Sequence, residues 1–439
     1  MKKIFLILGT ALVMQSCSRF LEERPYDFVS PENLQGSPDG VKQMITGMYA
    51  VFFNAQMFHN EAWIYLSCCD NDWTNGLEWV MGTYGVGNFA GGWIYNNSGN
   101  DPYYVFYRMI RAANAVLEVL PSVTFDPSES DLKEQFEGEA LTMRSLAYFY
   151  LVQMYGAVPL HLRTDDPATM SRTPVKEVYE QICKDLHEAE GKLFLNSKNP
   201  VSGRIKRGHF RKGAAQLLMA KVYATMGSGS LTGETITVPL TLTIRPDSTV
   251  ERTEKTIPKN KVAGYDFDSM VCYDSAKSVA TRLIDTREYQ METYANTWNP
   301  LNFGGKDFVF ALETDSLYSN ATTVFNKFFT PVGLKGSGWM TYAKDLYYLY
   351  DRDDTRGLYG IAHEFRSNYA YQGVYNREVF PAEDSISYYV KYGINNVIVN
   401  KNSNQCYLMK WYLGNAASPS IQLKESEVSV VSTPTQNFP

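Results

Sequence analysis

The sequence predicts a mainly α-helical fold, an array of packed helices with long loops and a small β-hairpin insertion. Three observations support this prediction. One stretch, Gly138–Leu160, is apolar on nearly every helical face, other segments repeat apolar residues at helical spacing, and one segment alternates apolar and polar residues. The 439-residue chain is 44% hydrophobic and 20% charged, an ordinary globular composition with enough apolar material for a large core.

The N-terminus has the pattern of a lipoprotein signal peptide. Two lysines precede an apolar run, Ile4–Met14, that is too short to span a bilayer. The next residues end in a serine followed by Cys17, and a small residue directly before a cysteine resembles a lipobox. We therefore predict a signal peptide over residues 1–16, lipidation of Cys17 and an extended lipidated tether over residues 17–37. The alternative is a plain secretory signal with an incidental cysteine.

The stretch Gly138–Leu160 predicts a central helix. One face carries apolar residues at i, i+3 and i+4 spacing, namely Ala140, Met143, Ala147, Tyr148, Leu151, Met154 and Tyr155. Further apolar residues cover most of the remaining surface, so the helix needs neighbours on several sides. The charged residues Glu139 and Arg144 interrupt the run and argue against a membrane span. Gly156 and Pro159 are expected to end the helix.

Six segments, the central one included, repeat apolar residues at helical spacing. They are Pro38–Phe53, Asp101–Leu120, Glu129–Tyr155, Thr173–Asn196, Gly203–Met226 and Asp274–Thr286. Thr173 is the expected N-cap of the fourth helix, with Pro174 at its first position, and Gly227 is expected to stop the fifth. Helical hairpins with alanine-lined faces are typical of tetratricopeptide-like packing, although no clean 34-residue repeat is visible.

Four segments outside these helices have other patterns. Residues 231–263 include a run that alternates apolar and polar residues and is enriched in β-branched ones, which predicts the β-hairpin insertion. Cys69–Asn100 is rich in Gly, Asn and Trp without a sustained period, which predicts a long structured loop. Tyr289–Asn302 is expected to form an aromatic loop, and Asp307–Leu312 a short strand.

Large aromatic residues gather in the irregular segments. They are Trp73, Trp79 and Trp93 in the first loop, Tyr294 and Trp298 in the second, and Trp339 in a third segment. Flat rings stack on the apolar faces of sugars, and a neighbouring amide such as Asn75 can hydrogen-bond sugar hydroxyls. These seven residues are therefore the candidate ligand-binding residues. The alternative is that the rings plug the loops onto the helices.

Charge and motif content argue against several function classes. The chain carries 41 Lys and Arg against 47 Asp and Glu, and a net charge of −6 offers no basic surface for nucleic acid. The five cysteines after Cys17 lack CxxC spacing, so buried free thiols are expected rather than disulfides or a zinc site. No P-loop or GxSxG motif occurs, and the five histidines are scattered. We predict no catalytic residue, no metal site and no cofactor. A glycosidase carboxylate pair stays open because such pairs have no fixed spacing.

Several segments resemble those of a known family. EALTMRSLAYFYLVQMYGAVPL, with its Tyr-Gly-x-Val-Pro ending, resembles the signature helix of the SusD/RagB family. SRTPVKEVYEQICKDLHEAEGKL, YDSAKSVATRLIDTREYQME and FVFALET look like the segments that follow it, and the order matches from Cys17 to about Lys410. The resemblance implies a tetratricopeptide-containing fold and a single SusD-like domain over residues 38–439. Residues 416–439 look unlike the helical ending usual in the family, and we hypothesise a truncated or altered end.

The resemblance also implies a function. It implies a non-enzymatic, lipid-anchored protein of the outer membrane, facing the exterior. Such a protein binds glycan and delivers it to a SusC-like TonB-dependent transporter. Some relatives are similar to RagB and bind peptides, so a binder of peptides or another nutrient is the second hypothesis. A glycosidase is the third.

Overall fold

The computed structural model describes residues 36–53, 102–197, 208–244, 250–297 and 305–312, together with eight short strand segments. Its helices are α3 (Pro38–Ala50), α6 (Pro102–Val119), α7 (Ser130–Tyr155), α8 (Val175–Lys192), α9 (Lys212–Ser230), α10 (Ser269–Asp285) and the single turn α11 (Tyr294–Thr297). Two short 3-10 turns, Val51–Phe53 and Leu120–Ser122, extend α3 and α6.

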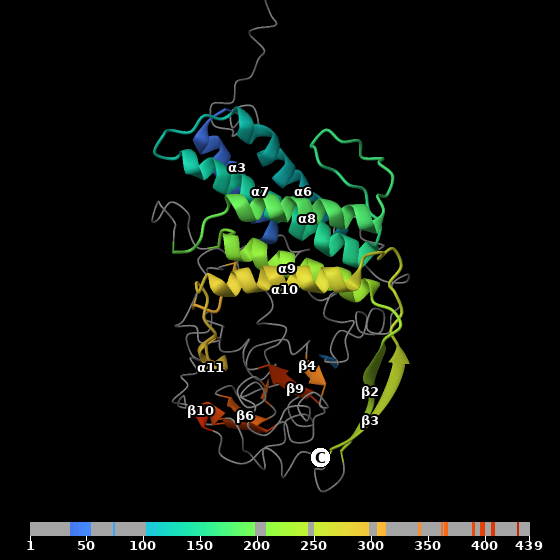
Figure 1. Ribbon diagram of the computed structural model, residues 1–439. Helices are drawn as coiled ribbons and strands as arrows, with labels where there is room; N and C mark the ends of the chain where they lie inside the picture. The colour runs from blue at the N-terminus through green and yellow to red at the C-terminus, as the bar shows by residue number, and fades with distance from the viewer. Residues whose placement is uncertain are drawn as a thin grey trace, which may run out of the picture.

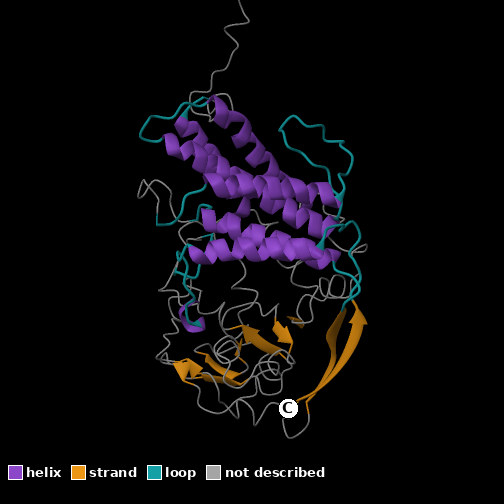
Figure 2. Ribbon diagram, in the orientation of Figure 1, coloured by secondary structure: helices purple, strands orange, loops and turns teal. Residues whose placement is uncertain are grey.

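The long helices form an array in which each helix from α6 to α10 packs on the next one in the chain (Figure 1). The first helix, α3, packs on α6 and α7. The strands and α11 lie beyond α10, on the side of the array away from α3 (Figure 2). A mainly helical, tetratricopeptide-like fold is therefore confirmed.

The central helix of the array is α7, as predicted. It packs against α3, α6, α8 and α9, and its apolar residues Met143, Ala147 and Leu151 are fully buried. Burial of one large apolar side chain contributes about 1.5–3 kcal/mol, so this shared core is the main apolar stabilisation of the array. The helix ends where expected, because Gly156 adopts a φ of 68° that favours glycine.

Two predicted helix starts are wrong. Thr173 is not the N-cap of α8, because its backbone N–H donates to the carbonyl oxygen of Val158 at 2.9 Å in an isolated β-bridge. Pro174 takes the N-cap position instead, and α8 begins at Val175. The last predicted helix, α10, begins at Ser269, five residues earlier than expected, because the Asp268 carboxylate accepts hydrogen bonds from two backbone N–H groups of its first turn.

The predicted bounds of α9 are also wrong. It begins at Lys212 rather than Gly203, and it continues through Gly227 to Ser230. Gly227 and Gly229 lie inside α9 and let side chains from other segments pack closely against it. A methyl group at Gly229 would lie 2.1 Å from Cδ1 of Tyr265. A glycine near the end of a helical pattern therefore did not mark a stop here.

Two further boundaries differ from prediction. The fourth helix ends at Lys192 rather than Asn196, because Leu193 is extended and the Phe194 N–H donates to the side chain of Gln135 at 2.8 Å. Residues 307–312 form turns and irregular backbone rather than a strand. Phe310 in that segment stacks on Phe210, with 4.4 Å between ring centroids, so packing onto the array fixes its course.

The strands that the structure describes form four small antiparallel sheets. The predicted hairpin is confirmed as β2 (Thr235–Ile244) and β3 (Val250–Pro258), with a register irregularity between Pro239 and Thr241. A four-stranded sheet has the order β1 (Trp73–Thr74), β4 (Thr341–Ala343), β9 (Gln405–Leu408), β5 (Ile361–Ala362). The remaining pairs are β6 (Glu364–Ser367) with β8 (Asn396–Val399), and β7 (Tyr389–Val390) with β10 (Val428–Ser429).

Candidate functional site

Most of the candidate ligand-binding residues lie outside the described residues. This holds for Asn75, Trp79, Trp93, Trp298 and Trp339, and for the predicted lipidation site Cys17. Trp73 is described through its backbone in β1, and Tyr294 lies in α11. The sequence-based assignment of these residues therefore stays a prediction.

The strand β1 connects two of the predicted aromatic segments. Trp73 pairs with Tyr342 and Thr74 pairs with Thr341, in antiparallel register. These partners belong to β4, which begins two residues after Trp339 in the sequence. β4 pairs in turn with β9, so the sheet joins segments that are more than 300 residues apart in the chain. Backbone pairing thus places the segment of Trp73 beside the strand that follows Trp339 in the sequence.

The second aromatic segment is held by local polar contacts. Tyr294 is half-buried in α11. The Asn296 side chain donates to the Glu292 carboxylate at 2.6 Å, and Thr297 makes a short hydrogen bond to Asp307. A backbone hydrogen bond between residues 290 and 306 closes the same segment. This region lies beyond α10 with the sheet of β1 (Figure 1).

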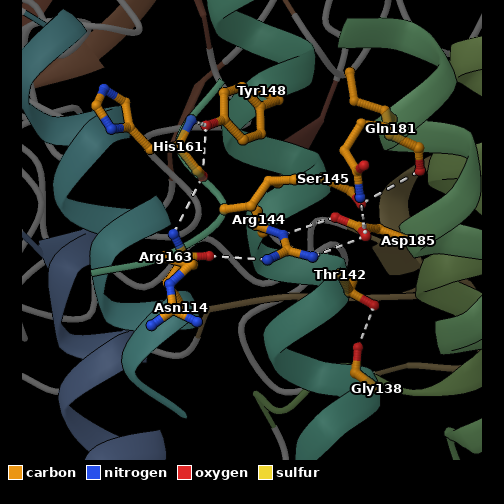
Figure 3. Close-up of polar contacts among 12 residues, drawn as sticks. Asn114, Gly138, Thr142, Arg144, Ser145, Tyr148, His161, Arg163, Gln181 and Asp185 are labelled. Carbon is orange, nitrogen blue, oxygen red and sulfur yellow. Dashed lines mark hydrogen bonds and ion pairs between the residues drawn. The ribbon is translucent and has the colours of Figure 1, made fainter. Parts of the chain in front are cut away.

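A buried ion pair crosses the interior of the array (Figure 3). Arg144 of α7 donates from Nε and Nη2 to the two carboxylate oxygens of Asp185 of α8, at 2.8 and 2.9 Å. Arg144 also donates to the side-chain oxygen of Asn114 of α6 at 2.9 Å, and Gln181 donates to Asp185 at 2.7 Å. The Arg144 and Asp185 side chains are only 9% and 3% exposed. One guanidinium therefore ties three consecutive helices together.

The same network reaches the segment between α7 and α8. The backbone carbonyl of His161 accepts hydrogen bonds from Tyr148 at 2.8 Å and from Asn114 at 3.1 Å (Figure 3). Burial raises the pKa of Tyr148 well above its usual range, so its hydroxyl stays protonated and can donate. The network thereby holds the loop after the central helix against α6 and α7.

A second polar cluster centres on Glu139, whose carboxylate is fully buried. It accepts hydrogen bonds from Tyr49 of α3 at 2.8 Å and from Gln135 at 2.7 Å, and it lies 2.8 Å from Nδ1 of His209. The Tyr49 hydroxyl also accepts from the backbone N–H of Phe210 at 2.7 Å. The carboxylates of Glu139 and Asp185 are both engaged by several donors, and this arrangement braces helices rather than presenting a free base.

An aromatic cluster joins the start of α6 to the end of α7. The ring centroid of Tyr103 lies 4.7 Å from that of Tyr107 and 5.1 Å from that of Tyr155. Neighbouring Tyr104 is 55% exposed. Sequence reasoning missed this cluster because its members lie on regular helices, where an aromatic residue reads as core.

Comparison with known proteins finds relatives of the first half of the chain. Residues 19–224, slightly less than half of the chain, match the SusD-like family model described as "starch-binding associating with outer membrane". This part of the chain is therefore similar to proteins of the SusD/RagB family. SusD-like protein P25 of Formosa agariphila is 26% identical over 218 residues, which are 47% of this chain and 40% of that protein. The match thus spans less than half of that relative's length.

Solved structures of SusD-like proteins share the fold. A SusD homolog from Bacteroides thetaiotaomicron has a TM-score of 0.59 at 18% identity and covers 90% of this chain and 70% of its own. A laminarin-binding SusD-like protein has a TM-score of 0.57 at 16% identity, with coverage of 86% and 72%. Among the helices that the structure describes, none is both long and apolar enough to cross a membrane.

Proposed function

We propose that this chain is a lipoprotein of the outer membrane that binds glycan and delivers it to a SusC-like TonB-dependent transporter. The family supports the proposal, because its model describes starch-binding proteins associated with the outer membrane. A solved protein of the same fold is itself described as laminarin-binding. The proposed role is binding rather than catalysis.

One observation carries the assignment of the site. The strand that contains Trp73 pairs with the strand that follows Trp339 in the sequence, in a family of carbohydrate-binding proteins. We assign ligand stacking to the tryptophans of these segments together with Tyr294 and Trp298, and hydroxyl recognition to Asn75. Stacking on a few rings in a shallow site gives weak affinity, with Kd from about micromolar to millimolar, or about −8 to −4 kcal/mol.

The test is a glycan-array screen of a Cys17→Ser chain, followed by calorimetric titration of the glycan that binds. Trp73→Ala combined with Trp298→Ala should abolish the binding heat while the circular dichroism spectrum stays unchanged. Trp411→Ala, a tryptophan outside the candidate set, should leave the heat unchanged. Equal binding heats in the double variant and in the protein with both tryptophans intact would reject the assignment. A silent array with binding of peptides would favour the second hypothesis.

Anchoring and delivery are tested in cells. The native chain should incorporate labelled palmitate and fractionate with outer membranes, whereas Cys17→Ser should do neither. The lipidated chain should also co-purify with a TonB-dependent transporter. Membrane attachment that is unchanged by Cys17→Ser would contradict the lipid anchor.

A further inference from the structure

Residues 305–312 contact both the helical array and the aromatic segment that contains Tyr294. On the array side, the ring of Phe310 stacks on that of Phe210, with 4.4 Å between the centroids and 28° between the planes. The Phe310 centroid also lies 6.2 Å from that of Phe52, and other residues of the segment pack against the same core. Apolar contacts therefore attach residues 305–312 to the array.

Polar contacts hold the ring of the array on which Phe310 stacks. Phe210 is 3% exposed, its backbone N–H donates to the Tyr49 hydroxyl at 2.7 Å, and its carbonyl oxygen accepts from the Gln135 amide at 2.9 Å. The hydroxyl and the amide also donate to the buried Glu139 carboxylate, at 2.8 and 2.7 Å. Side chains from α3 and α7 thus fix the backbone of Phe210, so the stack rests on a rigid base.

Two hydrogen bonds join residues 305–312 to the aromatic segment. The backbone N–H of Gln290 donates to the carbonyl oxygen of Lys306 at 3.0 Å, and the Thr297 hydroxyl makes its short bond to the Asp307 carboxylate. These bonds lie on either side of Tyr294 in the sequence. Because α11 is a single turn, and a helix this short is not stable by itself, such outside contacts must hold it in place.

We propose that Phe310 is a positioning residue for the ligand site, and that it holds Tyr294 in place through residues 305–312. The inference rests on the proposed function, in which Tyr294 stacks on the glycan. Phe310 acts through this segment rather than by touching the ligand, since its ring is engaged by Phe210. A ring that is fixed before binding loses less conformational entropy when the ligand arrives, so this contact should increase the affinity for glycan.

Hydrogen exchange, followed by mass spectrometry of the Cys17→Ser chain, tests the positioning without a ligand. Phe310→Ala removes the stacked ring and should speed exchange in peptides that span residues 290–297 by about tenfold. Phe310→Leu keeps an apolar side chain of similar length and should restore most of the protection. The matched control is Tyr150→Ala, because Tyr150 is also half-buried and stacks on a phenylalanine, Phe106, at 5.4 Å. It should leave exchange over residues 290–297 unchanged.

A second variant breaks the other end of the connection. Thr297→Val removes the bond to Asp307 but leaves the stacked rings intact, and it should also speed exchange over residues 290–297. Calorimetric titration of the glycan selected by the glycan-array screen then measures the effect on binding. Phe310→Ala and Thr297→Val should each weaken the affinity by about threefold to tenfold, whereas Tyr150→Ala should not change it.

The outcomes decide the proposal. Unchanged exchange over residues 290–297 in both Phe310→Ala and Thr297→Val would overturn it, and so would faster exchange without a loss of affinity for a glycan that binds the unsubstituted chain. Unchanged exchange in peptides of α8 checks that the array is folded, and if Phe310→Ala does not fold, Thr297→Val gives the decision. If no glycan binds the unsubstituted chain, the proposed function fails, while the exchange rates still decide whether Phe310 positions Tyr294.

Discussion

The buried ion pair between Arg144 and Asp185 should be the most sensitive point of the helical array. Arg144→Met keeps an apolar stem but removes three hydrogen bonds, two to Asp185 and one to Asn114. It leaves a carboxylate that is 3% exposed, whose remaining donor among the described residues is the Gln181 amide. Breaking such a buried pair costs about 3–5 kcal/mol, a large share of a typical folding free energy of about 5–15 kcal/mol.

Thermal unfolding followed by circular dichroism measures this effect. The unfolding entropy of a 439-residue chain is about 0.9 kcal/mol/K, so the Tm of Arg144→Met should fall by about 3–5 °C. Adding Asp185→Leu removes the uncompensated carboxylate, so the double variant should regain part of the loss. The matched control is Arg163→Met, because Arg163 also makes two hydrogen bonds to a carboxylate, that of Asp165, but both side chains are more than half exposed. Its Tm should not change.

Two results would refute this reasoning. The first is a Tm of Arg144→Met within error of the unsubstituted protein. The second is a double variant that is no more stable than Arg144→Met alone, since the cost could then not come from a carboxylate left without its partner.

Two further predictions concern packing and pH. Gly229→Val should lower the free energy of unfolding by about 1–3 kcal/mol, because its Cβ would overlap the ring of Tyr265. Gly47 lies at an exposed position of α3 with open space around it, so Gly47→Ala should raise the free energy of unfolding by about 0.5–1 kcal/mol. Urea unfolding of both variants measures these changes. Burial raises the pKa of Glu190, but hydrogen bonds from Arg282 and Gln216 outweigh it and lower the pKa overall. The pair therefore stabilises the protein above the unfolded glutamate pKa of about 4.3, and the stability difference from Arg282→Met should shrink as the pH falls from 6 to 3. A difference that grows on acidification would contradict this assignment.

The helical part of the fold could be predicted because its signal is local. Periodic apolar residues located α7 to within a residue at each end. The partners of its charged residues could not be located in the same way, since Asp185 is 41 residues from Arg144 and His209 is 70 residues from Glu139. In the sequence these two charges serve only to exclude a membrane span, whereas in the structure they hold the helices together.

Other differences come from signals with two physical meanings. A glycine near the end of a helical pattern can be a C-cap or a point of close packing, and Gly227, the predicted stop, is the second because a Cβ there would lie 3.1 Å from the ring of Tyr273. Thr173 has the chemistry of an N-cap, but its backbone is used in a bridge to Val158. The ring contact of Phe210 and Phe310 likewise joins two distant segments of the chain, so no spacing in the sequence could predict it.

The array and the proposed ligand site should contribute independently to stability. A ligand that binds only the folded state adds RT ln(1 + [L]/Kd), or about 1.4 kcal/mol at ten times Kd. This gain is smaller than the folding free energy that Arg144→Met is expected to lose, so ligand binding cannot restore the stability of the helical array. Adding the glycan identified in the binding screen should nevertheless raise the Tm of Arg144→Met and of the unsubstituted protein by the same amount. The reason is that the ion pair lies among α6, α7 and α8, whereas the strand of Trp73 lies beyond α10. A rise that disappears in Arg144→Met would show that the braced helices position the binding segments directly.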